Sequence, residues 1–197
     1  ISIEKKLQIY DWYFEAMRAS HSGQALDIHG LDYLIEKAVK SSKAANELPL
    51  EVISIHKLKS AAPASYLARI GACLGDGTDE QINALAQFFE ALGISFQIID
   101  DVLNLKGFKD NTKIKAEDLT AEKITFPVAM AIKLLPKNDK KRLWEIVKLK
   151  TKKNLLLNEA LQLIQKSDAL NISERFAKNY MERAWRKLDP LIKDSMV

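Results

Sequence analysis

Residues 97–104 place four polar side chains on one face of an otherwise apolar helical pattern. The four are Gln97, Asp100, Asp101 and Asn104, and their spacing puts them on one narrow stripe of a helix. Two adjacent carboxylates in apolar surroundings are unfavourable unless a cation compensates their charge. Carboxylate and amide oxygens suit Mg²⁺, which binds few protein oxygens and completes its shell with water and phosphate. The stripe therefore predicts a metal site on a helix, whereas the acid pair alone would also fit a solvated helix end.

The same stretch predicts which face of this helix is packed in a core. Residues 75–78 read as a turn, with Thr78 as the N-cap of the helix and Gln81 at the capping-box position. Apolar residues then recur at helical spacing, and we expect them to face the interior. They are Phe89, Leu92, Phe96, Ile99 and Leu103.

A polar segment over 105–127 follows the stripe and is rich in lysine. Ammonium groups beside a metal suit the binding of a diphosphate, because metal and lysines share the charge of the anion. A run of lysines alone is also typical of a solvated surface. The lysines are Lys106, Lys109, Lys113, Lys115 and Lys123.

Composition favours a globular, all-α protein. The 197 residues include 47% apolar residues, seven glycines and five prolines, and no alternating pattern is strong enough to predict a sheet. The net charge of +4 is spread along the chain, which does not indicate a nucleic-acid partner. The single Cys73 excludes an internal disulfide and disfavours a cysteine-based zinc site. No apolar run approaches about 20 residues, so we expect no transmembrane segment and a cytoplasmic protein.

Helical periodicity divides the rest of the chain into several expected helices. We expect a loop at 41–49, with Pro49 in the first turn of the next helix and Pro63 kinking that helix. The N-terminus has no initiator Met and no signal-peptide character, which indicates a fragment. The expected helices cover 4–40, interrupted at Gly23, then 49–74, 79–106, 126–135, 139–150, 153–166 and 173–195.

Residues 96–127 resemble the second aspartate-rich region of the trans-isoprenyl diphosphate synthases. That family has the pattern FQxxDDxx(D/N), a lysine in the following loop, and then EDLxxGKxxxP. Two family glycines are replaced here, by Ile114 and Glu122. The family's GQxxD element matches 23–27, and its Lys-Thr pair matches Lys59 and Ser60. The matching residues of the main region are Phe96, Gln97, Asp100, Asp101, Asn104, Lys113, Glu117, Asp118, Leu119, Lys123 and Pro127.

The resemblance implies an all-α bundle of the isoprenoid-synthase type. Residues 1–197 would form the C-terminal two-thirds of one prenyltransferase domain, and the first aspartate-rich motif of the family is not found. We therefore expect this polypeptide alone to be inactive. The stretches GQALDI, HKLKSAAP and FQIIDDVLNL also resemble the prenyltransferase half of fungal two-domain terpene synthases, in which a terpene cyclase domain precedes this one.

The implied reaction joins isopentenyl diphosphate to an allylic diphosphate after Mg²⁺-assisted ionisation of the allylic C–O bond. Such chemistry requires charge stabilisation on the leaving oxygens and no nucleophilic side chain. By resemblance, Asp100 binds Mg²⁺ directly, Asp101 supports it through water or a lysine, and Asn104 completes the metal stripe. Lys59 acts with these aspartates in catalysis. Substrate binding falls to Gln24, Asp27, Lys59, Ser60, Phe96, Gln97, Lys113 and Lys123.

Product and assembly follow from the same resemblance. Asn104 at the last motif position is typical of eukaryotic geranylgeranyl diphosphate synthases, so we expect geranylgeranyl diphosphate as the product, with farnesyl or a twenty-five-carbon diphosphate as the open alternatives. The family forms homo-oligomers, either dimers or hexamers.

Two other functions fit a helical chain of this kind. A class I terpene cyclase would carry an Asn-Asp-x-x-Ser-x-x-x-Glu-like metal motif, and the sequence shows none. A non-catalytic or regulatory subunit of a prenyl synthase assembly would carry a damaged second motif, and here that motif is intact. Both alternatives stay open from the sequence alone.

Overall fold

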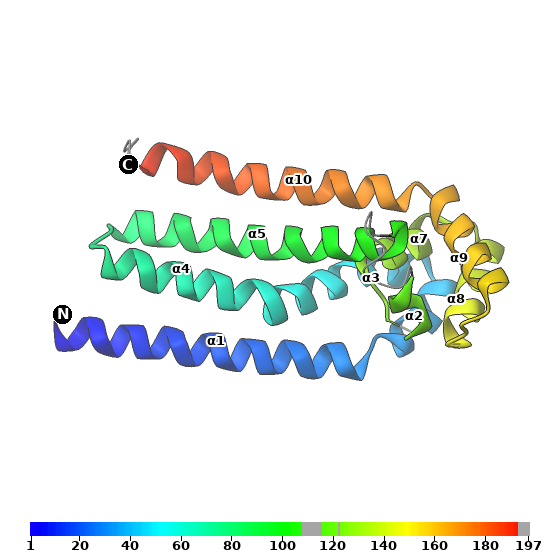
Figure 1. The fold of residues 1–197 in the computed structure, drawn as a ribbon, viewed down its shortest axis with the longest axis horizontal. Helices are drawn as coiled ribbons and strands as arrows, with labels where there is room; N and C mark the ends of the chain where they lie inside the picture. Colours follow the sequence, from blue (N-terminus) through cyan, green and yellow to red (C-terminus); the bar gives the residue numbers. More distant parts are fainter. Residues whose placement is uncertain (108–115, 122, 193–197) are drawn as a thin grey trace. The chain divides into compact units, whose positions relative to one another are not determined.

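The computed structural model describes residues 1–107, 116–121 and 123–192, and these residues form helices and connecting turns without a strand. This confirms the all-α fold class. The chain divides into two compact units, which are described in turn (Figure 1). The first unit comprises Ile1–Leu26, Ile55–Gln97 and Ala177–Val197, and the second comprises Asp27–Ser54 and Ile98–Phe176.

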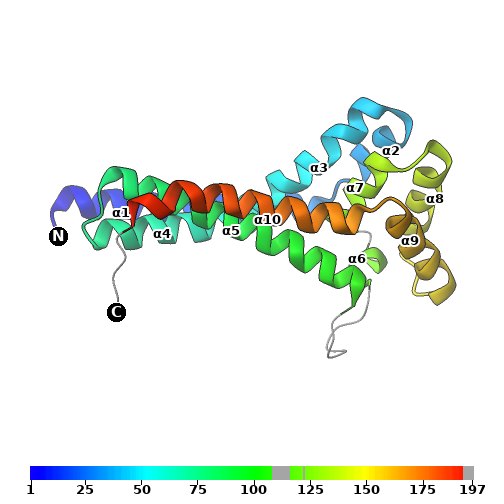
Figure 2. The same ribbon diagram turned by 90° about the horizontal axis from the view of Figure 1, so that it is seen from above.

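Four long helical segments run side by side in the first unit (Figures 1 and 2). They belong to α1 (Ile3–His29), α4 (Ala62–Leu74), α5 (Asp79–Lys106) and α10 (Ala169–Leu188). The π-helix η1 (Lys57–Ala61) precedes α4, and the 3₁₀-helix η2 (Asp189–Leu191) follows α10.

Serine hydroxyls and aromatic rings join these segments. The Ser65 hydroxyl of α4 donates to the carbonyl oxygen of Ala86 in α5 at 2.8 Å. The buried Ser95 hydroxyl of α5 donates to the carbonyl oxygen of Ala177 in α10, also at 2.8 Å. Each hydroxyl satisfies a carbonyl of the neighbouring helix and fixes the two helices lengthwise.

The helix expected over 4–40 is two helices, and its interruption is not at Gly23. The first helix, α1, continues through Gly23 and ends at His29; Gly30 then adopts a φ of +78°, and α2 (Asp32–Lys40) follows. A positive φ is a conformation that glycine adopts at no steric cost, which explains the break at Gly30. Along α1 only Gly23 is buried, whereas Leu7, Tyr10 and Phe14 are more than half exposed.

The second unit contains the shorter helices and the C-terminal end of α5. The helix α7 (Phe126–Leu134) is buried along most of its length and contacts α2, α8 (Lys137–Lys148) and α9 (Asn154–Lys166). At its start the rings of Phe126 and Phe176 lie 5.1 Å apart. Besides α2 and most of α3 (Ser42–His56), the helices of this unit are α6 (Glu117–Thr120), α7 (Phe126–Leu134), α8 (Lys137–Lys148) and α9 (Asn154–Lys166).

The loop expected at 41–49 is wrong, because α3 begins at Ser42 and passes through Pro49. Proline within a helix removes one hydrogen bond and disfavours the preceding turn, at a free-energy cost of about 3 kcal/mol. The surrounding residues Ala45, Leu48 and Val52 are each at most 2% exposed. Burial of this apolar face offsets the cost of the proline and keeps the helix continuous.

The start of α5 is confirmed, but its buried face is not the expected one. Thr78 and Gln81 form the reciprocal capping box, with Thr78 Oγ1 accepting from the Gln81 amide at 3.2 Å and Gln81 Oε1 accepting from the Thr78 amide at 3.0 Å. Phe96, expected in the core, is 69% exposed, and Leu103 is 38% exposed. The most deeply buried residues of this part of α5 are Ile94, Ile98, Val102 and Leu105.

Two apolar stripes therefore run along α5, and both have helical spacing. Spacing alone does not distinguish them, because the choice depends on the helices that pack against α5. By length and composition α5 could also cross a membrane, but a core helix passes the same test, and Ile94, Ile98 and Val102 are fully buried.

The later helices α7, α8, α9 and α10 begin and end within a few residues of the expected positions, except the C-terminus of α10 at Leu188.

Candidate functional site

The polar stripe lies on one uninterrupted helix. The helix α5 runs from Asp79 to Lys106 without a break, so the expected helical spacing of the stripe is confirmed. Gln97 belongs to the first compact unit, and Asp100, Asp101 and Asn104 belong to the second. The contacts of the stripe are therefore described within each unit.

In the first unit, Ser60 and Gln97 are in contact. The Ser60 hydroxyl donates to Gln97 Oε1 at 3.0 Å in a partly buried position. This bond joins the hydroxyl of the Lys59–Ser60 pair to the first residue of the stripe. The sequence did not predict this bond, and the assignment of both residues to a substrate site stays a prediction.

Lys59 and Ser60 lie in the five-residue π-helix η1. The kink that we expected at Pro63 takes this form. A proline ring clashes with the carbonyl four residues earlier in an α-helix, and for Pro63 that residue is Lys59. Widening the turn to π geometry relieves the clash, and single π turns are frequent at functional sites.

Gly23 packs directly against this π-helix. A Cβ atom built on Gly23 would lie 2.3 Å from the backbone nitrogen of Lys59, so only glycine allows α1 to approach so closely. The GQxxD element thus fixes the position of η1 through its glycine. Its other members differ: Gln24 is exposed in the first unit, and Asp27 is half-buried in the second.

In the second unit, Asp101 and Asn104 bind the backbone of the returning chain. The Asp101 side chain is 1% exposed, and its Oδ2 accepts a hydrogen bond from the Phe126 amide at 3.0 Å. Asn104 Oδ1 accepts from the Asp118 amide at 3.3 Å, and the Asn104 carbonyl accepts from the Ala116 amide at 2.9 Å. Both ends of the segment 116–126 are therefore bonded to the stripe.

Asp118 is a further acid beside the stripe. Burial raises the pKa of the Asp118 carboxyl, Lys123 opposes the rise, and the Asp101 and Asp100 carboxylates add to it. Lys123 Nζ lies 4.0 Å from Asp118 Oδ1, and the Lys123 amide donates to the Asp118 carbonyl at 2.9 Å. Asp118 was not among the site residues predicted from the sequence. Its place in the EDL element of the family motif was the signal that could have identified it.

This group of residues fits a hard divalent cation. Asp100, Asp101 and Asp118 offer only oxygen donors. Burial is the main cause of the raised pKa of Asp118, the carboxylates of Asp101 and Asp100 add to it, and a cation would favour the ionised form. Over 1–107, 116–121 and 123–192, no three His, Cys, Asp or Glu side chains form a metal cluster by themselves. Water and phosphate oxygens would therefore complete the shell. Lys113, Ile114 and Glu122 lie outside the described residues.

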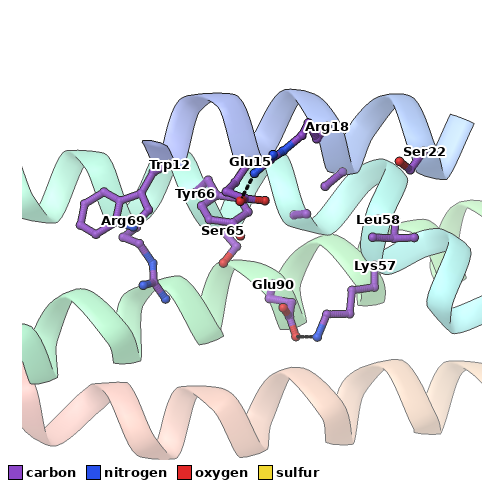
Figure 3. Close-up of a pocket in the computed structure, with 12 residues that line it drawn as sticks. Trp12, Glu15, Arg18, Ser22, Lys57, Leu58, Ser65, Tyr66, Arg69 and Glu90 are labelled. Atoms are coloured by element: carbon purple, nitrogen blue, oxygen red, sulfur yellow. Dashed lines mark hydrogen bonds and ion pairs between the residues drawn. The ribbon is translucent and has the colours of Figure 1, made fainter. Parts of the chain in front are cut away.

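A pocket in the first unit is distinct from the predicted residues. It has a volume of about 650 Å³ and lies between α1, the η1–α4 region and Glu90 of α5 (Figure 3). Lys57 Nζ pairs with Glu90 Oε1 at 3.1 Å across it, and the Arg69 guanidinium lies 5.4 Å from the centre of the Trp12 ring. None of the predicted site residues of this unit lines the pocket.

Comparison with known proteins gives the family. A family model described as polyprenyl synthetase matches residues 2–164, which is most of the chain. This chain belongs to the polyprenyl synthetase family. The resemblance to trans-isoprenyl diphosphate synthases is thereby confirmed.

Two relatives each match more than half of this chain. It is 35% identical over 115 residues to the heterodimeric geranylgeranyl pyrophosphate synthase large subunit 1, chloroplastic, of Arabidopsis thaliana, covering 56% of this chain and 28% of that protein. It is 33% identical over 118 residues to a short chain isoprenyl diphosphate synthase of Methanocaldococcus jannaschii, covering 59% of this chain and 36% of that protein.

A solved structure confirms the isoprenoid-synthase type of fold. The geranylgeranyl pyrophosphate synthetase of Pyrococcus horikoshii matches with a TM-score of 0.79 and 27% identity. The match covers 98% of this chain and 56% of that structure. The chain thus spans little more than half of the polyprenyl synthetase structure that it resembles.

Proposed function

We propose that the whole protein is a trans-prenyltransferase that joins isopentenyl diphosphate to an allylic diphosphate. The observation that carries this proposal is the buried Asp118 carboxyl, whose pKa is raised by burial and also by Asp101 and Asp100, beside Lys123 in a chain of the polyprenyl synthetase family. Acids that repel each other beside a cationic side chain suit a metal–diphosphate complex. A protein that only supported a partner subunit would not need this arrangement.

Several residues of the chain then have distinct tasks. Bound Mg²⁺ would stabilise the charge that develops on the diphosphate as it leaves. Asp100, supported by Asp101 and Asn104, would hold that ion. Lys59, Lys113 and Lys123 would bind the oxygens of the allylic diphosphate, each as a point charge with three donors. The other substrate-binding residues in this proposal are Gln24, Asp27, Ser60, Phe96 and Gln97.

The surroundings of Gln97 support its assignment. Its Oε1 accepts from the Ser60 hydroxyl, and its amide nitrogen carries two N–H donors of the kind that suit diphosphate oxygens. A carbon skeleton that becomes cationic after ionisation needs no nucleophile, and the chain supplies orientation and charge alone. The proton lost from the isopentenyl carbon would pass to the departing diphosphate, which is the strongest base that the reaction itself provides.

The finer assignments belong to the same proposal. Geranylgeranyl diphosphate is the proposed product, supported by Asn104 and by the named product of the Arabidopsis and Pyrococcus relatives. Assembly as a homodimer or hexamer, a fused terpene cyclase domain and a cytoplasmic location complete the proposal.

The deciding experiment is an assay of the full-length protein. We would incubate it with isopentenyl and farnesyl diphosphates and Mg²⁺, beside Asp100→Ala, and identify products by mass spectrometry. We expect a twenty-carbon diphosphate from the wild type and a loss of turnover of at least 100-fold in the variant, an order of magnitude typical for lost charge stabilisation. An intact full-length protein that forms no elongated product would overturn the proposal.

A further inference from the structure

Positive charge is concentrated in the helix α8 and the turn that follows it. Residues 137–153 contain eight lysine and arginine residues and two acidic residues, so their net charge is +6 in a chain whose total is +4. The rest of the chain therefore carries a net charge of −2. The lysines are less evenly spread than the composition suggested, and this stretch is where an anionic partner would be attracted.

Acidic residues balance much of the charge along α8 itself. The Arg142 guanidinium donates to both oxygens of the Glu159 carboxylate, at 2.7 and 2.8 Å, and Lys148 Nζ lies 3.0 Å from Glu36 Oε1. These ion pairs join α8 to α9 and to α2 within the second unit. Contacts inside the protein therefore account for a large part of the charge of α8.

The turn that joins α8 to α9 contains lysines but no acid (Figure 1). It comprises residues 149–153, with lysines at positions 150, 152 and 153. Lys152 and Lys153 are exposed, and over 1–107, 116–121 and 123–192 neither has a carboxylate within salt-bridge distance. Like charges held close together repel each other, so an anion from outside the chain would be favoured at this turn.

Two leucines flank these lysines and are largely exposed to solvent. Leu149 is 61% exposed, and Leu155 is 82% exposed, more than any other large apolar residue in the part of the chain that the structure describes. The Thr151 hydroxyl accepts a hydrogen bond from the Lys153 amide at 3.1 Å, which helps to fix the turn between them. One exposed leucine is ordinary, but two leucines around a cluster of lysines form an amphipathic surface.

This amphipathic surface suits a lipid bilayer better than a nucleic acid. At an anionic membrane the ammonium groups contact lipid phosphates, and the leucine side chains enter the boundary of the acyl region. A nucleic acid would attract the lysines equally well. Its phosphate backbone, however, offers no apolar region in which Leu149 and Leu155 could be buried.

A pocket beside α8 continues the positive surface. It has a volume of about 540 Å³, which is in the range of small-molecule sites, and it lies between α2 and α8 in the second unit. Val39 and Trp144 form part of its wall, and Lys148 at its edge directly precedes the turn. Among the described residues, no carboxylate lies within salt-bridge distance of Lys40 or Lys137. The lysines that line the pocket are Lys40, Lys137, Lys141 and Lys148.

We propose that the turn 149–153, together with Leu149 and Leu155, docks on a membrane that contains anionic phospholipids. The pocket between α2 and α8 would hold the phosphate headgroup of one such lipid. The protein would then lie on the membrane surface as a peripheral protein. None of these residues belongs to the proposed catalytic site, so the inference goes beyond the proposed function and does not rest on it.

Sedimentation of the full-length protein with lipid vesicles tests this inference. We expect binding to phosphatidylcholine vesicles that contain about 30% phosphatidylserine, weaker binding at high salt, and little binding to phosphatidylcholine alone. Lys152→Glu combined with Lys153→Glu should weaken binding by roughly 25-fold or more, about fivefold for each lysine. The matched control is Lys178→Glu combined with Lys187→Glu, which makes the same change of charge on α10 and should weaken binding less than about threefold.

The apolar contribution and the pocket are tested with the same vesicles. Leu149→Ser combined with Leu155→Ser should weaken binding by roughly tenfold or more at low and at high salt, because apolar burial is not screened. Leu67→Ser is the control, since this leucine of α4 is 63% exposed and lies in the first unit. Lys137→Glu should weaken binding about fivefold through the pocket. All these side chains are exposed, and thermal unfolding should show that every variant folds.

Equal binding to neutral and anionic vesicles, or unchanged binding in the Lys152 and Lys153 double variant, would overturn the inference. Unchanged binding in the leucine double variant, with retention of the wild type on polyuridylic acid, would assign the surface to a nucleic acid instead. Unchanged binding in Lys137→Glu would remove the pocket from the docking surface. Prenyl transfer in solution should be the same in all these variants, and its absence from the wild type would count against the proposed function only.

Discussion

The Ser60 hydroxyl donates a hydrogen bond of 3.0 Å to Gln97 Oε1, linking the π-helix η1 to the polar stripe of α5. Ser60→Ala should lower the free energy of unfolding by about 1 kcal/mol, because the partly buried amide oxygen loses its donor. Urea unfolding of the full-length protein measures this difference. Ser60→Thr keeps the hydroxyl and is the matched control.

A double-mutant cycle with Gln97→Ala isolates the bond itself. We expect a coupling free energy of roughly 0.5–1 kcal/mol between the two positions. Ser54→Ala, which removes an exposed hydroxyl bonded to the Leu50 carbonyl of its own helix, should change stability very little. A coupling indistinguishable from zero would show that the contact contributes nothing to stability.

Gly23→Ala should destabilise the protein by roughly 1–3 kcal/mol or more, since the new methyl group would meet the backbone of Lys59 at 2.3 Å. The chain contains a matched control in Gly71, which is also helical and has nothing within 4 Å of a built Cβ. Gly71→Ala should stabilise by about 0.5–1 kcal/mol through the better helix propensity of alanine. Thermal unfolding of both variants checks the pair, and equal shifts of the same sign would contradict the close approach.

Asp118→Asn should change the pH dependence of stability. Burial raises the pKa of the Asp118 carboxyl, with the neighbouring Asp101 and Asp100 adding to the rise against Lys123. A raised carboxyl pKa means that the folded state binds more protons than the unfolded chain. Stability from this group therefore falls as the pH rises from the unfolded-state pKa through the raised folded-state pKa.

In a buffer that contains a metal chelator, Asp118→Asn should therefore be more stable than the wild type near neutral pH. This gain in the free energy of unfolding should shrink as the pH falls toward about 4. Urea titrations at several pH values provide the measurement. With Mg²⁺ and inorganic diphosphate present, the carboxylate becomes favourable and the order of the two proteins should reverse. A stability difference independent of pH would refute the raised pKa.

Thr78→Ala should cost about 1 kcal/mol of stability, because the Gln81 amide loses its acceptor at the start of α5. Thr78→Ser keeps the capping oxygen and should be close to the wild type. Guanidinium unfolding of the three proteins is the measurement. If the serine variant loses as much as the alanine variant, packing of the threonine methyl group and not the cap stabilises this end.

Local signals in the sequence predicted the features that depend on near neighbours. Thr78 and Gln81 of the capping box stand three positions apart, and the first and last residues of the stripe of α5 stand seven positions apart, so helical geometry alone relates their side chains. The motif residues of the polyprenyl synthetase family were recognisable for the same reason, since they stand at fixed offsets.

The features that depend on distant parts of the chain were not predictable in this way. The cap that Asp101 provides for the Phe126 amide joins residues far apart in sequence. Neither residue type indicates in the sequence that the other is its hydrogen-bond partner. The choice between the Ile94–Ile98–Val102 stripe and the stripe containing Phe96 depends on which helices pack against α5. Likewise, Pro49 signals a helix start by itself, and only the burial of Leu48 and Val52 overrides that signal.

The π-helix η1 has a consequence for tolerance to length changes. Each residue of an α-helix advances the chain by about 100° around the axis, and a π turn accommodates one additional residue. Removing a single residue from Lys57–Ala61 would let the chain revert to α geometry without shortening any neighbouring helix noticeably. Ser60 would then lose its place beside Gln97, whereas the helical residues on either side of the turn would keep their relative orientation. A one-residue deletion would therefore leave the segment helical while removing the contact that Ser60 makes.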